Sequence, residues 1–171
     1  GPGYDYDVTN ADVILNRLNV RDGRLTLPDG LSYAVLVLPD REDIHPAVLA
    51  RIEKLVADGA TVIGPRPRRA SGLEGFAASD ARVKELAAQL WGDLDGRERT
   101  SRPHGTGRIV HGKTEREVLA EMKVTPDFTA PAALVKKGDL LFKLDDKELQ
   151  QQRASNLTDI ERARLSLEKA E

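Results

Sequence analysis

The chain has 171 residues and a formal net charge of -2; 40% of its residues are apolar and 32% are charged, which is typical of a globular protein of one domain, with or without a small appendage. This charge gives no electrostatic case for a nucleic-acid-binding protein, and no segment reaches the roughly 18 consecutive apolar residues of a membrane span. The sequence contains no cysteine, which excludes disulfides, thiolate metal sites and cysteine nucleophiles.

Both ends of the sequence look cut. It begins Gly1-Pro2-Gly3 without a signal-peptide pattern, and it stops at Glu171 within a helical pattern that has no cap. We therefore expect a fragment, or a join of fragments.

The first fifty residues predict a helix, a hairpin and a buried strand. Thr9 or Asn10 is a plausible N-cap for a short apolar helix. Residues 20–27 alternate around Asp22-Gly23, which is a strong signal for a two-residue hairpin turn. The continuous apolar run at 33–38 predicts a strand that is buried on both faces.

A helix and a second strand complete a βαβ unit. Pro46 suits the first turn of a helix, an apolar stripe follows at three- and four-residue steps, and Gly59 suits the C-terminal cap. Residues 61–63 are a short β-branched strand. A strand, a helix and a strand within about thirty residues predict a right-handed parallel unit.

The pattern continues as α/β to Phe128. Residues 79–91 predict a helix capped by Ser79, and residues 92–107 predict a loop or a mobile insertion. Residues 108–110 read as a third strand, followed by the capping-box pair Thr114 and Glu117. The predicted fold class is α/β, with a small parallel sheet flanked by helices.

The character of the sequence changes after Phe128. Residues 129–134 read as a linker, and residues 135–144 read as a turn and a short β segment. A long, polar C-terminal helix is predicted from Asp145 to Glu171. Its thin apolar seam would need a coiled-coil partner, and it consists of Leu149, Leu157, Ile160, Ala163, Leu167 and Ala170.

Separated motifs through residue 128 carry a family resemblance. They include Gly3-Tyr4-Asp5-Tyr6-Asp7-Val8-Thr9-Asn10, then Leu27-Pro28-Asp29-Gly30, and finally Gly107-Arg108-Ile109-Val110 with Pro126-Asp127-Phe128. This string resembles the region after the catalytic barrel in bacterial α-L-rhamnosidases of glycoside hydrolase family 106. The resemblance implies a non-catalytic accessory domain of class I glutamine-amidotransferase-like or flavodoxin-like fold. It also implies that the missing catalytic barrel of the parent hydrolase is the partner, and that this chain alone is inactive.

The tail resembles a different family. The run from Val135 to Asp146, followed by a helix rich in Gln and Ala, is similar to the lipoyl-like half-motif of HlyD-type periplasmic adaptors, the membrane fusion proteins. A fusion near Thr129, natural or artefactual, would join the two parts. Together the two resemblances imply a periplasmic or secreted location, although composition leaves the location open. Lys147 precedes a helix instead of sitting at a hairpin tip, so lipoylation is not expected.

The candidate substrate-binding residues are Asp5, Asp7 and Asn10. A glycosidase needs two carboxyl groups across the scissile bond, and in the family resembled here those groups lie in the barrel. Asp5 and Asp7 would share one face of an extended segment, where they could touch the substrate or the rim of the barrel. The alternative is a capping and turn role beside Thr9 and Asn10.

The sequence gives little evidence for an anion-binding, metal or cofactor site or for a serine nucleophile. The basic cluster Arg66, Arg68 and Arg69 could bind an anion or be a solvated loop. The histidines His45, His104 and His111 are too scattered for a metal site, and no motif predicts a cofactor. No serine nucleophile elbow is present.

Two other functions remain open. The chain could be a component of a HlyD-type export adaptor whose tail sets the function. It could also be a free-standing small-molecule-binding domain, with its ligand beyond the strand ends near Pro39-Asp40 and Gly64-Pro65.

Overall fold

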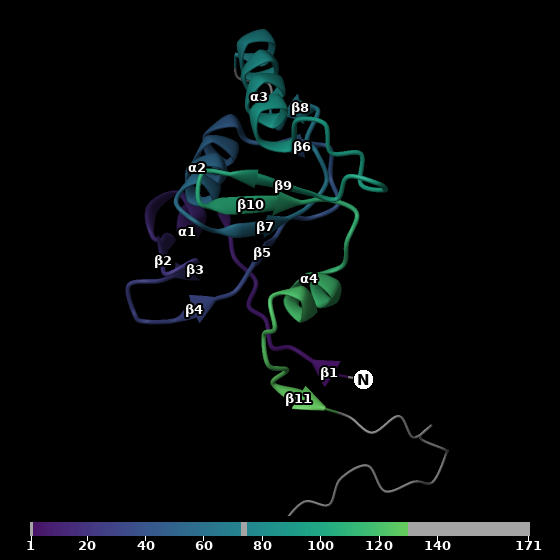
Figure 1. The fold of residues 1–171 in the computed structure, drawn as a ribbon. Helices are drawn as coiled ribbons and strands as arrows, with labels where there is room; N and C mark the ends of the chain where they lie inside the picture. The colour runs from purple at the N-terminus through teal and green to yellow at the C-terminus, as the bar shows by residue number, and fades with distance from the viewer. Residues whose placement is uncertain (1, 73–74, 130–171) are drawn as a thin grey trace, which may run out of the picture. The chain divides into compact units, whose positions relative to one another are not determined.

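The computed structural model describes residues 2–72 and 75–129 (Figure 1). Of the linker expected at 129–134 only Thr129 is described; the rest of the linker, and the β segment and C-terminal helix expected at 135–171, lie outside the described residues. The described elements, in chain order, are β1 (Pro2–Gly3), α1 (Ala11–Asn16), β2 (Asn19–Arg21), β3 (Arg24–Thr26), β4 (Ser32–Tyr33), β5 (Leu36–Val37), β6 (Asp43–Ile44), α2 (Pro46–Ala57), β7 (Thr61–Ile63), β8 (Arg69–Ala70), α3 (Phe76–Trp91), β9 (Ser101–His104), β10 (Gly107–Val110), α4 (Glu115–Glu121) and β11 (Phe128–Thr129).

A four-stranded sheet in the order β5-β7-β10-β9 lies at the centre. The first three strands are parallel, with Leu36 opposite Val62 and Ile109 opposite Val62 on its other side. β9 pairs antiparallel with β10 at the edge. The predicted α/β class with a small sheet is confirmed, but the sheet is not wholly parallel, because β9 is antiparallel.

The predicted strand–helix–strand unit is β5-α2-β7. His45 caps α2 because its Nδ1 accepts the backbone N–H of Ala47 at 3.2 Å, and Pro46 occupies the first turn as expected. One face of the helix is fully inside the protein and consists of Val48, Leu49, Ile52, Leu55 and Val56.

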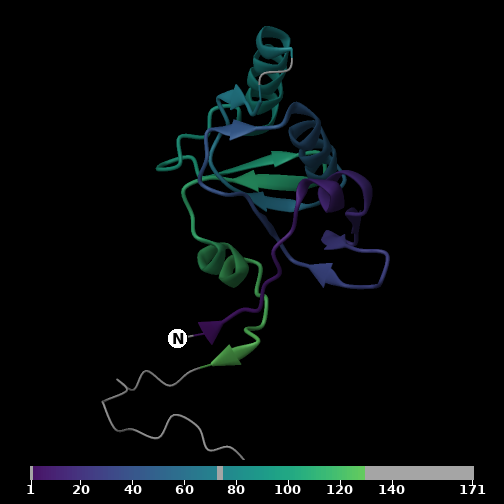
Figure 2. The same ribbon diagram turned by 180° about the vertical axis from the view of Figure 1, so that it is seen from behind.

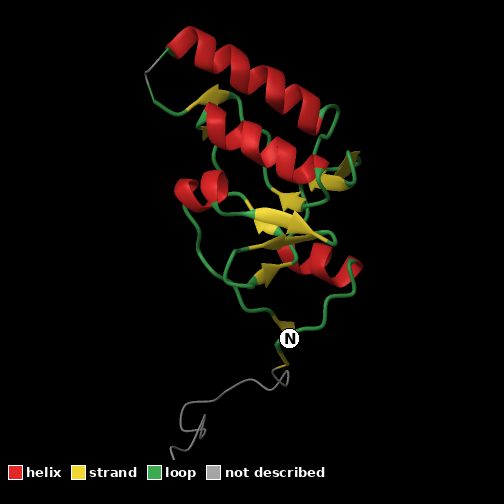
Figure 3. Cartoon of the chain, turned by 90° about the vertical axis from the view of Figure 1, so that its left-hand side faces the viewer, coloured by secondary structure: helices red, strands yellow, loops and turns green. Residues whose placement is uncertain are grey.

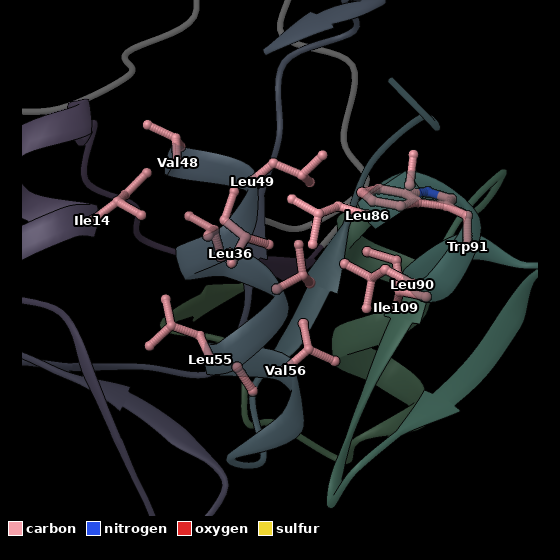
Figure 4. Packing of buried hydrophobic residues seen from close by; sticks show 14 of the residues in the cluster. Ile14, Leu36, Val48, Leu49, Leu55, Val56, Leu86, Leu90, Trp91 and Ile109 are labelled. Atoms are coloured by element: carbon pink, nitrogen blue, oxygen red, sulfur yellow. The ribbon is translucent and has the colours of Figure 1, made fainter. Parts of the chain in front are cut away.

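α2 and α3 lie side by side over one face of the sheet (Figure 3). α3 begins at Phe76, three residues before the predicted Ser79 cap, because Gly75 adopts the left-handed conformation (φ 58°) and serves as N-cap. Gly92 ends the helix as predicted. Its buried face forms the main core together with α2 and the sheet (Figure 4), and consists of Val83, Leu86, Ala87, Leu90 and Trp91.

The opposite face of the sheet packs against α4 (Figures 1 and 2). Ile63 and Val110 point to this side and contact Val118, in a smaller core cluster. The predicted capping box is present: Thr114 Oγ1 accepts the backbone N–H of Glu117, and the Glu117 carboxylate accepts the backbone N–H of Thr114 at 2.7 Å. The Thr114 backbone N–H and the Thr114 hydroxyl both donate to the Glu117 carboxylate, and these two hydrogen bonds lower the pKa of Glu117 below its ordinary value of 4.5.

Replacing Thr114 by alanine is expected to cost about 1 kcal/mol of unfolding free energy, because the first turn of α4 loses its cap. The lowered pKa of Glu117 means that its contribution is present above pH 4.5 and is lost as the pH falls through the folded-state value. The difference in unfolding free energy between the wild type and Thr114→Ala should therefore shrink in acid. Urea unfolding at neutral and acidic pH measures both effects, with the exposed Thr125→Ala as control; equal losses in the two variants would contradict the capping role.

One prediction was wrong in the first half of the chain. Residues 33–38 do not form one strand buried on both faces. Ser32–Tyr33 is β4, which pairs antiparallel with β3, whereas Leu36–Val37 is β5 in the central sheet. The chain changes sheets between them, so each piece is short. β5 is an edge strand of the sheet, which leaves Val37 49% exposed.

The predicted hairpin at Asp22-Gly23 is confirmed. β2 and β3 pair antiparallel, and both turn residues have positive φ (52° and 73°). A second hairpin replaces much of the predicted loop at 92–107, since β9 pairs with β10 across a turn at Gly105. The sequence of β9, Ser-Arg-Pro-His, has no apolar alternation that could have predicted a strand.

The two ends of the described fold meet. β1 pairs antiparallel with β11, with Gly3 opposite Phe128. The Phe128 ring lies directly over Gly3, where a Cβ would come within 2.0 Å of it. Within the described residues, no helix is long and apolar enough to cross a membrane.

Candidate functional site

Residues 4–9 link β1 to α1 as an extended segment, which we call the N-terminal strap. Asn10, at its end, caps α1 because its Oδ1 accepts the backbone N–H of Val13 at 3.1 Å. The backbone N–H of Asp5 donates to Asp127 at 2.7 Å, and the Asp5 carboxylate accepts the backbone N–H of Tyr6 at 3.0 Å. Of the three predicted substrate-binding residues, Asp5 and Asn10 therefore make hydrogen bonds that hold the protein's own backbone.

Asp7 holds the middle of the strap. Its Oδ2 accepts a hydrogen bond of 2.7 Å from the hydroxyl of Tyr33 in β4. This bond raises the pKa of Tyr33 above its ordinary value of 10.0, and burial and the negative charge of Asp7 act in the same direction. Asp5 and Asp7 thus engage different partners, on either side of Tyr6.

Replacing Asp7 by alanine is expected to lower the pKa of Tyr33 toward its ordinary value, because the acceptor and its charge are both removed. In the wild type, the stabilisation given by the Tyr33–Asp7 hydrogen bond is fully present below pH 10.0 and is lost as the pH rises through the folded-state pKa of Tyr33. The variant should therefore be less stable than the wild type at neutral pH, and this difference should shrink in base. NMR of labelled tyrosine rings measures the titration. Asp40→Ala is the matched control, and an unchanged Tyr33 titration in Asp7→Ala would contradict the contact.

The carboxyl ends of the parallel strands were a candidate ligand site. Leu38 packs directly against Gly64, where a Cβ would come within 2.6 Å of the Leu38 Cβ. The Gly64 carbonyl accepts the indole N–H of Trp91 at 3.0 Å. The space beside Gly64 is therefore filled by side chains of the protein itself.

The basic cluster after β7 borders a hollow of about 350 Å³, lined by Arg66, Pro67, Arg68 and Lys84. Arg66 donates to the carbonyl of Gly92 at 3.1 Å. Arg68 lies 3.4 Å from the carboxylate of Glu42, and its side chain is 76% exposed. These contacts agree with the solvated-loop reading of the cluster.

The histidines have separate roles. His45 caps α2, and His104 on β9 lies 2.6 Å from the Glu53 carboxylate on α2. His111 packs its ring against Gly96, with its Nδ1 buried and without a hydrogen-bond partner. Sequence reasoning missed the Glu53–His104 pair, because the two residues are 51 positions apart and neither lies in a motif. Within residues 2–72 and 75–129, no group of three His, Asp or Glu side chains could hold a metal ion.

Comparison with known proteins identifies relatives that are much longer than this chain. The family model described as alpha-L-rhamnosidase matches residues 1–147. A rhamnosidase structure from Novosphingobium sp. PP1Y superposes with a TM-score of 0.65 and 29% sequence identity; the match covers 77% of this chain and 12% of that one. A protein of Formosa agariphila described as "putative beta-glucuronidase" is 44% identical over 90 residues, which is 53% of this chain and 8% of that protein.

The family match also bears on the tail. It crosses the join expected near Thr129 and ends at Lys147, within the segment that resembles a HlyD-type adaptor. The adaptor resemblance and the coiled-coil expectation gain no support from these comparisons. Because the family model covers most of the sequence, the chain belongs to glycoside hydrolase family 106, the family described as alpha-L-rhamnosidase.

Proposed function

We propose that residues 1–128 form a non-catalytic α/β domain of an α-L-rhamnosidase-like glycoside hydrolase. The observation that carries this proposal is the family match over residues 1–147 in a chain that spans only 12% of a solved rhamnosidase. The catalytic acid and base would belong to a barrel outside this sequence. The domain would pack on that barrel and help to shape the sugar site.

Within this domain, the N-terminal strap is the segment that we place next to the sugar-binding site of the parent hydrolase. Asp7 and Asn10 fix its course through Tyr33 and the α1 N-terminus, while Tyr6 and Val8 remain 80% and 90% exposed. We propose that Asp5, Asp7 and Asn10 position the strap at the rim of the active site. Direct contact of a strap carboxylate with substrate hydroxyls belongs to this proposal, because carboxylates accept hydrogen bonds from sugars readily.

The fold type and the substrate are also part of the proposal. Three parallel strands with α2 and α3 on one face and α4 on the other agree with an amidotransferase-like domain. The chain contains no cysteine, so it could not act as a thiol amidotransferase. The substrate class would be an α-L-rhamnoside. The export-adaptor and free-standing ligand-binding hypotheses have no comparable support.

A chimera tests the accessory role. The matched region of the Novosphingobium rhamnosidase would be replaced by residues 1–147 of this chain. We expect a folded enzyme that still hydrolyses an aryl α-L-rhamnoside, since the barrel and its carboxyl groups are unchanged. A chimera that folds and binds substrate as the parent enzyme does, but no longer hydrolyses it, would contradict the proposal that this domain is a non-catalytic accessory domain.

A further inference from the structure

Four of the exposed large apolar side chains belong to the strap and to the strands β5 and β11. Tyr6 is 80% exposed, Val8 90%, Val37 49% and Phe128 59%, and we call these four residues the strap face. Leu31, in the turn before β4, is 52% exposed. An exposed apolar set of this kind, gathered on one side of a domain, is typical of an interaction surface.

Hydrogen bonds and strand register place these residues together. The strap is joined to the segment before Phe128 through the Asp5 N–H and the Asp127 carboxylate, and to β4 through Asp7 and Tyr33. In Figures 1 and 2 the strap runs between α4 and β4, below the sheet.

Val37 belongs to the same side. It pairs with Ile63, which pairs with Val110 in turn, and neighbouring residues of paired strands point to the same face. Ile63 and Val110 contact α4, so Val37 also points to the α4 side of the sheet. α4 has only seven residues and leaves Val37 at the edge half exposed.

The two faces of the central sheet are therefore covered to different extents by helices. Sheets with parallel strands are normally covered on both faces, because each face buries apolar side chains. Here α2 and α3 cover one face with helices of 12 and 16 residues, whereas the strap and α4 cover the other incompletely. The strap is held by polar ties at Asp5, Asp7 and Asn10, which leave the side chains of Tyr6 and Val8 exposed to solvent.

We propose that the strap face is the docking surface for the catalytic part of the same polypeptide, an inference that rests on the proposed function. The relatives are about eight to twelve times longer than the region they share with this chain, as their 12% and 8% coverage shows. β1 and β11 lie side by side, so polypeptide that flanks this domain in the longer relatives would join it at this end. Phe76, which is 58% exposed, begins α3 on the other face of the sheet and lies outside the docking surface.

Hydroxyl-radical footprinting of the chimera described above tests this surface. Each side chain's oxidation rate in the chimera is divided by its rate in the 171-residue chain alone. Tyr6 should react about eightfold more slowly, because a core interface residue would fall from 80% to about 10% exposure. Phe128 should be protected as well, and Phe76 should react equally in both proteins. Protection of Phe76 with unprotected Tyr6 and Phe128 would overturn the inference.

Two further readouts separate the possible failures. Hydrolysis by the chimera reports on the accessory role, whereas the footprint reports on the surface; an active chimera with an unprotected strap would reject the docking surface alone. The intact Novosphingobium rhamnosidase needs no chimera and covers the case in which the chimera does not fold. Its peptide aligned with residues 4–9 should be protected from oxidation relative to its peptide aligned with the start of α3, and equal oxidation would overturn the inference.

Discussion

Replacing Gly107 by alanine is expected to destabilise the domain by at least about 3 kcal/mol, at the upper end of overpacking costs. A Cβ at this position would come within 2.3 Å of the carbonyl oxygens of both Ala60 and Val56. These are backbone atoms at the end of α2 and the start of β7, which cannot move like a flexible side chain. The strand and the helix would have to separate.

The close approach of Gly107 to the backbone of Val56 and Ala60 allows hydrogen bonds between the β9–β10 hairpin and the end of α2. The turn between β9 and β10 supplies hydrogen bonds to the end of α2: the Thr106 N–H and hydroxyl both donate to the Ala57 carbonyl, at 3.0 and 3.1 Å. The Arg108 N–H donates to the Ala60 carbonyl at 3.0 Å. Carbonyls at a helix end lack partners within the helix, so losing this contact would leave them unpaired.

Urea unfolding followed by circular dichroism measures the Gly107 effect. Gly30→Ala is the matched control, because Gly30 has a φ of 93° but open space where the Cβ would stand. The control should lose only about 1–2 kcal/mol, the cost of a left-handed conformation with a side chain. A Gly107→Ala loss no larger than that of Gly30→Ala would contradict the backbone contact.

Replacing Trp91 by alanine is expected to cost about 3–5 kcal/mol, the usual loss for a fully buried large aromatic residue. Trp91 is 0% exposed and lies at the end of α3 beside Leu86 and Leu90 (Figure 4). Its indole N–H also donates to the carbonyl of Gly64 at the end of β7. The side chain therefore joins the main core to the central sheet by packing and by a buried hydrogen bond.

Trp91→Phe separates the two contributions. Phenylalanine keeps most of the apolar contacts but leaves the Gly64 carbonyl unpaired, which should cost about 1–3 kcal/mol. Phe76→Ala, at the exposed end of the same helix, should change stability by less than about 0.5 kcal/mol. Thermal and urea unfolding of the three variants rank these effects. Equal stability of Trp91→Phe and wild type would show that the hydrogen bond contributes nothing.

Local signals predicted the parts of the fold that depend on neighbouring residues. The Asp22-Gly23 hairpin, Pro46 in the first turn of α2 and the Thr114–Glu117 capping box are confirmed, because each is set within a few positions. Of the two caps predicted for α1, Thr9 and Asn10, the structure has Asn10. The apolar stripe of α2 also predicted its buried face correctly, since a helix repeats its facing at three- and four-residue steps.

The parts that the sequence could not predict depend on distant partners. The run at 33–38 is split because Tyr33 pairs with Leu25 in one sheet while Leu36 pairs with Val62 in another. β9 is a strand because β10 pairs with it, although its own composition predicts a loop. In the strap, Asp5 meets Asp127 across 122 positions, a contact that no local pattern encodes.

The central claim, that this chain is an accessory domain without the catalytic carboxyl pair, is tested most directly by an activity assay. The purified 171-residue chain would be incubated with an aryl α-L-rhamnoside beside an intact family enzyme at equal molar concentration. We predict no product release above that of a blank without protein. Hydrolysis that co-elutes with the folded 171-residue chain on size-exclusion chromatography, and that is absent from the blank, would contradict the account.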